Sequence, residues 1–309
     1  MHMQKNTIIC LMGPTGAGKS RLAFELVERF PFEIISVDSA MVYRDMNIGT
    51  AKPTQAELKK APHRLIDIRD PGERYSVGEF RYDALCEINS IFANKKIPLL
   101  VGGTMLYFKA LQEGLSDLPS ADPKIREKIV RQAEQLGWPA LHKKLTQRDP
   151  KAAKRIHEND SQRIQRALEL IETSKQSVSS LYAESPCEPL PHKIINIGLI
   201  PEDRAWLHRR IEQRFDAMLE EGFVDEVKKL YARGDLTHDL PSMRSVGYRQ
   251  VWDYLDGKYD FDAMREKAII ATRQLAKRQL TWLRGWPNLH NLHAESASLF
   301  DVFRICQLL

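Results

Sequence analysis

The sequence predicts an α/β fold with a mostly parallel sheet, an inserted helical domain and a helical C-terminal region. Short apolar runs alternate with helical stretches in the N-terminal part, which is typical of parallel sheets. Strand patterns vanish between residues 121 and 185, and helical periodicity dominates from residue 202 onward. The predicted domains are therefore a core of residues 1–120 and 186–309 and an insert of residues 121–185.

The strands and helices are expected in a regular order. A strand over 7–12 leads into a glycine-rich turn over 13–18 and a helix from 19 to about 30. Further strands are expected over 33–37, 64–68, 97–101 and 194–200, and C-terminal helices over 203–221, 223–233 and 262–283. Ligands of parallel sheets bind beyond the carboxyl ends of the strands, so Gly13, Asp38 and residues 102–104 should meet at one cleft.

Composition indicates an ordinary globular protein, with 43% hydrophobic and 28% charged residues. A net charge of +5 and a pI near 8.9 suit a polyanionic partner without requiring one. The four cysteines have no metal-site spacing, the N-terminal segment has no signal-peptide pattern, and no apolar run approaches the roughly 18 residues of a membrane span. We therefore expect a cytoplasmic protein without membrane contact.

The glycine-rich turn matches the phosphate-loop pattern G-x-x-x-x-G-K-[ST], and it has the required strand before it and helix after it. Its residues are Gly13, Pro14, Thr15, Gly16, Ala17, Gly18, Lys19 and Ser20. Backbone N–H groups and the helix N-terminus bind phosphate oxygens, Lys19 neutralises charge, and Ser20 can ligate Mg²⁺. This predicts a P-loop nucleotide-kinase-like core. Most such loops bind ATP or GTP, but the strand over 97–101 lacks the terminal carboxylate that organises magnesium in those proteins, which favours a pyrophosphate leaving group.

Asp38 and Thr104 each allow two interpretations. Asp38 follows a strand and can accept a proton from a nucleophile, or it can cap the turn that begins Asp-Ser. Thr104 follows two glycines and can face the phosphate site, or it can cap the next helix, and both roles are compatible.

Two helical segments carry side chains suited to nucleic acid. Residues 162–166 combine amide and guanidinium groups, and Lys277, Arg278 and Arg284 lie on or beside one stripe of a C-terminal helix. The alternative is a solvated helix surface. Trp282 can stack on an unpaired base, although aromatic residues at helical spacing more often pack in a core.

Nearly the whole chain resembles the tRNA dimethylallyltransferase family, also called isopentenyl-pyrophosphate:tRNA transferases, of the bacterial type. The matching segments are GPTGAGKS (13–20), DSAMVYR (38–44), IGTAKP (48–53), YSVGEF (75–80), GGTMLYFKAL (102–111), RIHENDSQRIQRAL (155–168), MRSVGYRQ (243–250) and ATRQLAKRQLTWLR (271–284). The family pattern DSMQVYR has a glutamine where this chain has Met41, and threonine is commoner than Ser20 in its phosphate loop.

The resemblance implies an enzyme that transfers a dimethylallyl group from its pyrophosphate ester to the N6 amine of the adenosine 3′-adjacent to the anticodon. Asp38 would be the general base, Lys19 and Thr104 would act on the leaving pyrophosphate, and Arg214 would add charge beside the loop and its Mg²⁺. The implied partner is the tRNA anticodon stem-loop, bound by a monomer. Its implied contacts are Asp38, Ser39, Ala40, Met41, Thr104, Arg126, Gln162, Arg163, Ile164, Gln165, Arg166, Arg244, Ser245, Val246, Gly247, Tyr248, Arg249, Lys277, Arg278, Gln279 and Arg284.

Two rival functions remain compatible with the residues. A P-loop small-molecule kinase would consume ATP without tRNA, and a non-catalytic RNA-binding switch would bind without forming a product. The basic segments favour RNA over the kinase, and the pairing of Asp38 with Thr104 favours catalysis over the switch. Residues 285–309 carry no functional signal.

Overall fold

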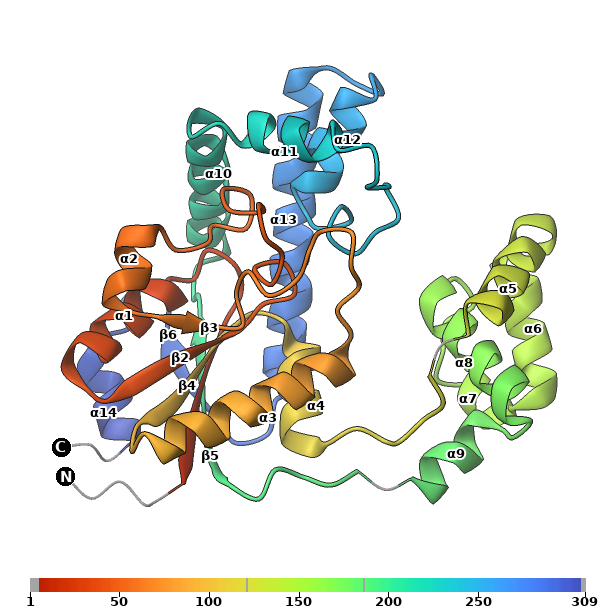
Figure 1. Ribbon diagram of the computed structural model, residues 1–309, viewed down its shortest axis with the longest axis horizontal. Coiled ribbons are helices and arrows are strands. Elements are labelled where there is room, and N and C mark those ends of the chain that lie inside the picture. The colour runs from red at the N-terminus through yellow and green to blue at the C-terminus, as the bar shows by residue number, and fades with distance from the viewer. Residues whose placement is uncertain (1–5, 121, 186, 307–309) are drawn as a thin grey trace. The chain divides into compact units, whose positions relative to one another are not determined.

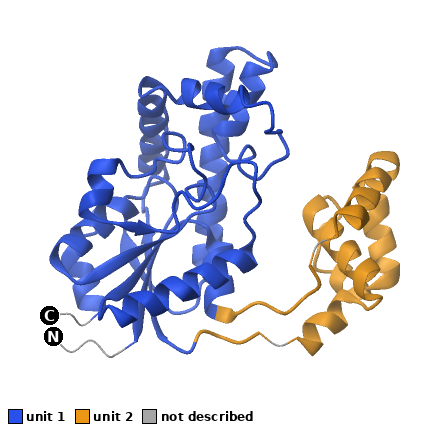
Figure 2. Cartoon of the chain, in the orientation of Figure 1, with its two compact units in different colours: residues 1–112, 191–309 blue, residues 113–190 orange. Residues whose placement is uncertain are grey.

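The computed structural model describes residues 6–120, 122–185 and 187–306, which form two compact units (Figure 2). Unit 1 comprises residues 1–112 and 191–309, and unit 2 comprises residues 113–190. The sequence predicted the insert at residues 121–185. Residue 121, where the predicted insert begins, and residue 186, where the predicted core resumes, lie outside the described residues.

Unit 1 is built on a six-stranded, all-parallel sheet with the order β3-β2-β4-β1-β5-β6 (Figure 1). The strands are β1 (Thr7–Met12), β2 (Phe32–Val37), β3 (His63–Arg64), β4 (Ile97–Gly102), β5 (Lys193–Ile200) and β6 (Leu289–His293). The parallel sheet confirms the predicted fold class. In the register, Gly102 of β4 pairs with Met12 of β1 and with Val37 of β2, so these three strands end side by side.

One predicted strand was wrong and one strand was missed. The run 64–68 forms only the short β3, because Leu65 and Asp67 adopt φ values of 63° and 56°, which no strand accommodates. Strand β6 lies in a region predicted to be helical or without signal. Its sequence LHNLH lies at the sheet edge, where three of its five residues are exposed and none is buried, so it lacks the apolar pattern by which buried strands are recognised.

Helices complete unit 1. They are α1 (Lys19–Arg29), α2 (Gln55–Lys60), α3 (Val77–Ala93), α4 (Met105–Glu113), α10 (Arg204–Glu220), α11 (Phe223–Tyr231), α12 (Tyr248–Leu255), α13 (Phe261–Arg284) and α14 (Leu299–Cys306). Leu22 and Leu26 of α1 share an apolar core with β1, β4 and Val302 of α14. This core fixes the start of α1 against the end of β1.

Unit 2 is helical, with α5 (Pro123–Leu136), α6 (Trp138–Arg148), α7 (Pro150–Ala153), α8 (Ser161–Ser174) and α9 (Val178–Glu184). Its core contains Leu141, Leu145, Ile164 and Leu168, which recur at helical spacing on α6 and α8. The buried Asp149 accepts hydrogen bonds from the N–H and hydroxyl groups of Ser179, each at 2.8 Å, and so links the segments before α7 and within α9.

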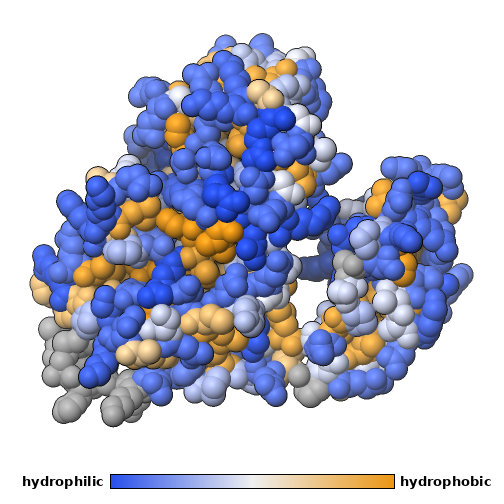
Figure 3. All heavy atoms as spheres, viewed as in Figure 1, coloured by the Kyte–Doolittle hydropathy of each residue, from blue (hydrophilic) through white to orange (hydrophobic). Residues whose placement is uncertain are grey.

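The surface is mainly hydrophilic on the face drawn in Figure 3, where apolar side chains form separate patches. Across the described residues, every helix is too short or too polar to cross a membrane.

Candidate active site

The phosphate loop connects the fully buried strand β1 to helix α1. Gly16 and Gly18 have φ values of 82° and 92°, in the left-handed region that favours glycine. Gly18 caps α1 without any side-chain hydrogen bond, so the first N–H groups of this helix lack a capping side chain. The sequence therefore produces a helix N-terminus that is suited to an anion.

Lys19 lies within this loop, where its Nζ donates to the carbonyl oxygens of Gly13 at 2.9 Å and Pro14 at 2.8 Å. Burial, together with repulsion from the nearby Arg214, lowers the pKa of Lys19 to about 7, while Asp38 opposes the shift. Bringing an anion to this ammonium would favour its charged form.

Asp38 directly follows β2, and one of its oxygens caps the next turn. Its Oδ1 accepts hydrogen bonds from the N–H groups of Ala40 at 2.8 Å and Met41 at 3.2 Å. The capping interpretation is therefore correct for Oδ1. The described residues provide no hydrogen bond to Oδ2, which leaves that oxygen available as a proton acceptor, so the two interpretations are compatible.

Thr104 follows β4 and lies against the segment that begins at Asp38. Its Oγ1 accepts from the N–H of Ser39 at 3.1 Å, and its own N–H donates to the carbonyl of Val37 at 3.3 Å. Gly102 makes this approach possible, because a Cβ there would lie 2.0 Å from the oxygen of Val37. The carboxylate and the hydroxyl are thus brought together at one edge of the sheet.

Helix α10 contributes two arginines beside the loop. Nε of Arg210 donates to the carbonyl of Gly16 at 2.8 Å, and its guanidinium lies 4.9 Å from the ring centre of Trp206. Arg214 is deeply placed, and burial lowers its pKa, an effect that Asp38 opposes. These two arginines therefore bring positive charge to the phosphate loop. They come from a distant part of the chain, since Arg210 and Gly16 are 194 residues apart in the sequence.

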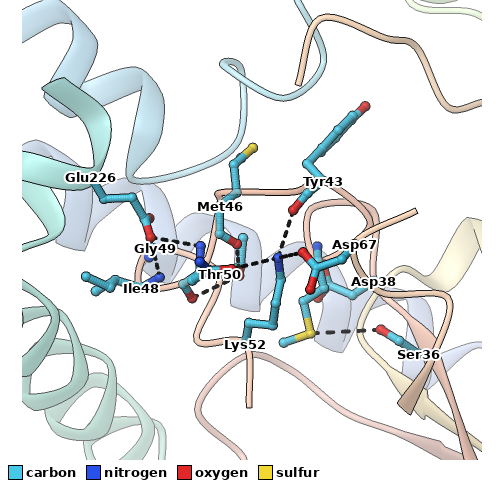
Figure 4. Close-up of polar contacts among 12 residues, drawn as sticks. Ser36, Asp38, Tyr43, Met46, Ile48, Gly49, Thr50, Lys52, Asp67 and Glu226 are labelled. Carbon is cyan, nitrogen blue, oxygen red and sulfur yellow. Dashed lines mark hydrogen bonds and ion pairs between the residues drawn. The ribbon is translucent and has the colours of Figure 1, made fainter. Parts of the chain in front are cut away.

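The segment over residues 47–53 also borders the site, and the charged side chains of Lys52 and Glu226 hold it in place (Figure 4). Lys52, with only 3% of its side chain exposed, donates to the carbonyl of Tyr43 at 2.7 Å and to Asp67 at 2.5 Å. Glu226 of α11 accepts from the N–H groups of Asn47 and Ile48 at 2.8 Å each. These contacts fix the segment from both sides.

Glu226 makes two further contacts, one to the N–H of Gly49 at 3.2 Å and one to the hydroxyl of Tyr248 at 2.6 Å. Gly49 packs so closely that a Cβ would lie 2.1 Å from the ring of Phe223. Neither Glu226 nor Lys52 was singled out from the sequence. Gly49 in the segment IGTAKP is the one local signal of close packing around residues 47–53. No pattern in the sequence around Glu226 identifies its carboxylate as part of the site.

A cavity of about 1110 Å³ in unit 1 brings many of the predicted residues together. The predicted residues that line it are 15–16, 18–20, 38–41, 104, 214, 244–248 and 278–279. Gly13, Pro14, Ala17, Arg249, Lys277 and Arg284 do not line it. Lys277 and Arg284 are instead exposed on α13, where they are accessible to a polyanion.

The remaining predicted contacts lie in unit 2. Gln162 and Arg163 are exposed on α8, and Gln165 is half-buried. Arg126 of α5 and Arg166 each approach the fully buried Glu169 at 3.3 Å. These two arginines are thus oriented by a carboxylate that the sequence analysis did not identify.

Three residues predicted to contact tRNA have buried side chains. Ile164 and Tyr248 are 0% exposed and Gln279 is 8% exposed. Ile164 packs in the core of unit 2, and Tyr248 bonds to Glu226. The structure gives each of these side chains a protein partner, but Tyr248 and Gln279 also line the cavity, whereas Ile164 does not.

Comparisons with known proteins give matches over most of this chain. The sequence model of the family described as IPP transferase matches residues 41–286. A protein of Coxiella burnetii (strain Dugway 5J108-111), named tRNA dimethylallyltransferase, is 57% identical over 300 residues, covering 97% of this chain and 96% of that relative.

Solved structures show the same similarity. The tRNA isopentenylpyrophosphate transferase of Bacillus halodurans superposes with a TM-score of 0.71 at 37% identity, covering 99% of this chain and 95% of that chain. A eukaryotic dimethylallyltransferase acting on tRNA superposes with a TM-score of 0.79 at 29% identity, covering 94% and 74% of the two chains.

Proposed function

Because this chain belongs to the IPP transferase family of tRNA dimethylallyltransferases, we propose that it transfers a dimethylallyl group from dimethylallyl pyrophosphate to the N6 amine of the adenosine 3′-adjacent to the anticodon in tRNA. One observation carries the proposal. The phosphate loop, Asp38 and Thr104 follow three neighbouring parallel strands and line a single cavity. This arrangement places a site for a pyrophosphate beside a proton acceptor.

The leaving group is the pyrophosphate, which takes the electron pair of the carbon–oxygen bond as that bond breaks. Gly16, Gly18, Lys19, Arg214 and Thr104 line the cavity, and we expect their N–H, ammonium, guanidinium and hydroxyl groups to stabilise this negative charge as it develops. Hydrogen-bond donors and charges that are fixed before the reaction stabilise the developing charge more than mobile water does, because they need not reorganise during the reaction.

The nucleophile is the N6 amine, whose nitrogen forms the new bond to the allylic carbon. Its proton passes to Asp38, where Oδ1 is already used by backbone N–H groups and Oδ2 supports the role of acceptor. The adenine must leave its stack, since N6 cannot align with the allylic carbon inside one.

Mg²⁺ would be held by the Ser20 hydroxyl, which borders the cavity at the start of α1. Magnesium usually takes few protein ligands and completes its shell with phosphate oxygens and water. That preference fits the described residues, where no cluster of three or more Asp, Glu, His or Cys side chains could hold a metal. Bound there, the ion would neutralise charge on the pyrophosphate.

The tRNA would contact the cavity rim over 244–247, the exposed cations of α13 and the polar face of α8. We further propose that the enzyme acts in the cytoplasm and as a single chain. The exposed Lys277 and Arg284 support backbone contacts, whose strength should fall steeply with salt.

Incubation of the protein with unmodified tRNA, Mg²⁺ and radiolabelled dimethylallyl pyrophosphate tests the function, with ATP replacing the donor in a parallel reaction. We expect label in the RNA without ATP. Lys19→Ala should abolish it, and Lys229→Ala, an exposed lysine on α11, should not. ATP hydrolysis without label in the RNA would refute the proposal and favour a kinase or a switch.

A further inference from the structure

Gln279 connects two parts of the active site that come from distant regions of the chain. Its Oε1 accepts a hydrogen bond from the N–H of Thr15 at 2.9 Å, and its Nε2 donates to the carbonyl oxygen of Gly103 at 2.9 Å. Thr15 belongs to the phosphate loop, and Gly103 directly precedes Thr104. The side chain is 8% exposed, so the protein supplies most of its surroundings.

The chain is shaped to allow this link. A Cβ at Gly103 would lie 2.2 Å from Nε2 of Gln279 and 3.3 Å from the carbonyl oxygen of Gly13. A side chain at position 103 would therefore displace the amide and press on the phosphate loop. Gly103 thus lets the backbone before Thr104 approach both the glutamine and the loop.

The chemistry of the link requires a primary amide. Joining an N–H group to a C=O group takes one acceptor and one donor on the same side chain, which glutamine supplies and methionine does not. Removing the amide would leave the N–H of Thr15 and the carbonyl of Gly103 without this partner in a largely buried place, which is costly.

We propose that Gln279 is a positioning residue that holds the phosphate loop and the Thr104 segment at a fixed separation, so that one pyrophosphate engages both. The proposal deepens the proposed prenyl transfer and rests on it. Gln279 acts on the reaction through its hydrogen bonds to Thr15 and to Gly103, the residue before Thr104. Its loss should weaken pyrophosphate binding and slow transfer while tRNA affinity persists.

The test compares Gln279→Met with Gln274→Met, which changes an exposed glutamine on the same helix. Binding of inorganic pyrophosphate with Mg²⁺ is measured by calorimetry, and binding of unmodified tRNA by filter retention. For Gln279→Met we expect about a tenfold rise in the pyrophosphate Kd, as for the loss of one or two buried hydrogen bonds, and an unchanged tRNA Kd. Gln274→Met should have the same pyrophosphate Kd and the same tRNA Kd as the wild-type protein.

A second variant covers the case in which Gln279→Met does not fold. Gln279→Glu keeps an acceptor, and when protonated it also keeps a donor for the carbonyl of Gly103. Its pyrophosphate affinity relative to the unchanged protein should therefore recover as the pH is lowered. The absence of such recovery would count against the proposal.

Two results would overturn the positioning role. A loss of tRNA affinity with unchanged pyrophosphate affinity would make Gln279 an RNA contact, as the sequence predicted. Unchanged affinities and turnover in Gln279→Met would show that the link is dispensable. Both results leave prenyl transfer intact, whereas the absence of labelled tRNA with the unchanged protein would refute the proposed function itself.

Discussion

Replacing Glu226 by glutamine tests whether a carboxylate on α11 holds the segment that borders the active site. Glu226 accepts hydrogen bonds from three successive backbone N–H groups, those of Asn47, Ile48 and Gly49, and from the hydroxyl of Tyr248. Glutamine has the same shape but replaces one oxygen by an NH₂ group. Whichever way the amide turns, at least one backbone N–H then faces a donor.

The magnitude follows from these contacts. Hydrogen bonds to a charged acceptor are worth about 1.5–3 kcal/mol, against about 0.5–1.5 kcal/mol for neutral pairs. One backbone bond is lost and the others become neutral, but Glu226 is half-exposed, so water compensates for part of the loss. We expect local opening of residues 47–49 to become easier by about 2 kcal/mol, which corresponds to roughly thirtyfold faster amide exchange.

Hydrogen–deuterium exchange read by mass spectrometry on peptides that cover residues 47–49 measures this effect directly. Asp225→Asn is the matched control, because it changes a neighbouring exposed carboxylate whose partner is Lys228 on the same helix. The control should leave exchange at 47–49 unchanged. Equal protection in Glu226→Gln and the unchanged protein would refute the reasoning, and so would an equal loss in the control.

Three further predictions concern other charged groups. Asp38→Ala should lower kcat by about 10²–10⁴-fold and leave tRNA affinity within about threefold, and parallel losses in both would contradict its role as the base. Burial lowers the pKa of Lys19 to about 7, so above that pH pyrophosphate binding should take up a proton and weaken as the pH rises. Calorimetry in buffers of different ionisation enthalpy measures this proton uptake, and the Lys19→Met variant provides the baseline. Equal uptake in the wild-type protein and in Lys19→Met would show that Lys19 is not the group that takes up the proton. Glu169→Gln should destabilise unit 2 by about 3 kcal/mol, because Arg126 and Arg166 lose their shared carboxylate, and unaltered amide exchange across α8 would argue against this.

Local sequence was sufficient for the phosphate loop and for the strands around it. A buried strand, glycines in left-handed conformations and a helix that starts at Lys19 all follow from residues within one short stretch. The positions of Asp38 and Thr104 also followed, because parallel strands end at a common edge and both residues lie within two residues of a strand end. The pairing of Asp38 with Thr104 could therefore be predicted before the structure was known.

Weak local patterns were not sufficient. The edge strand β6 is mostly exposed and has too few apolar residues to be recognised as a strand. The run 64–68 is apolar enough to suggest a strand, but its left-handed residues end β3 at Arg64. The apolar residues of α8 and α13, Ile164 among them, are buried as their helical spacing indicates, but that spacing did not reveal that the polar Gln279 is buried as well.

By itself the sequence determined the phosphate-binding motif, the fold class and the residues that follow the central strands, since the motif and each of these strands are encoded in contiguous residues. Only the tertiary structure decided which distant side chains complete the site. Gln279 reaches Thr15 across 264 residues, and Glu226 reaches Asn47 across 179. Such pairings leave no local periodicity, because they depend on where packing places each helix, and a buried polar side chain is distinguished from an exposed one only when its partners are in place.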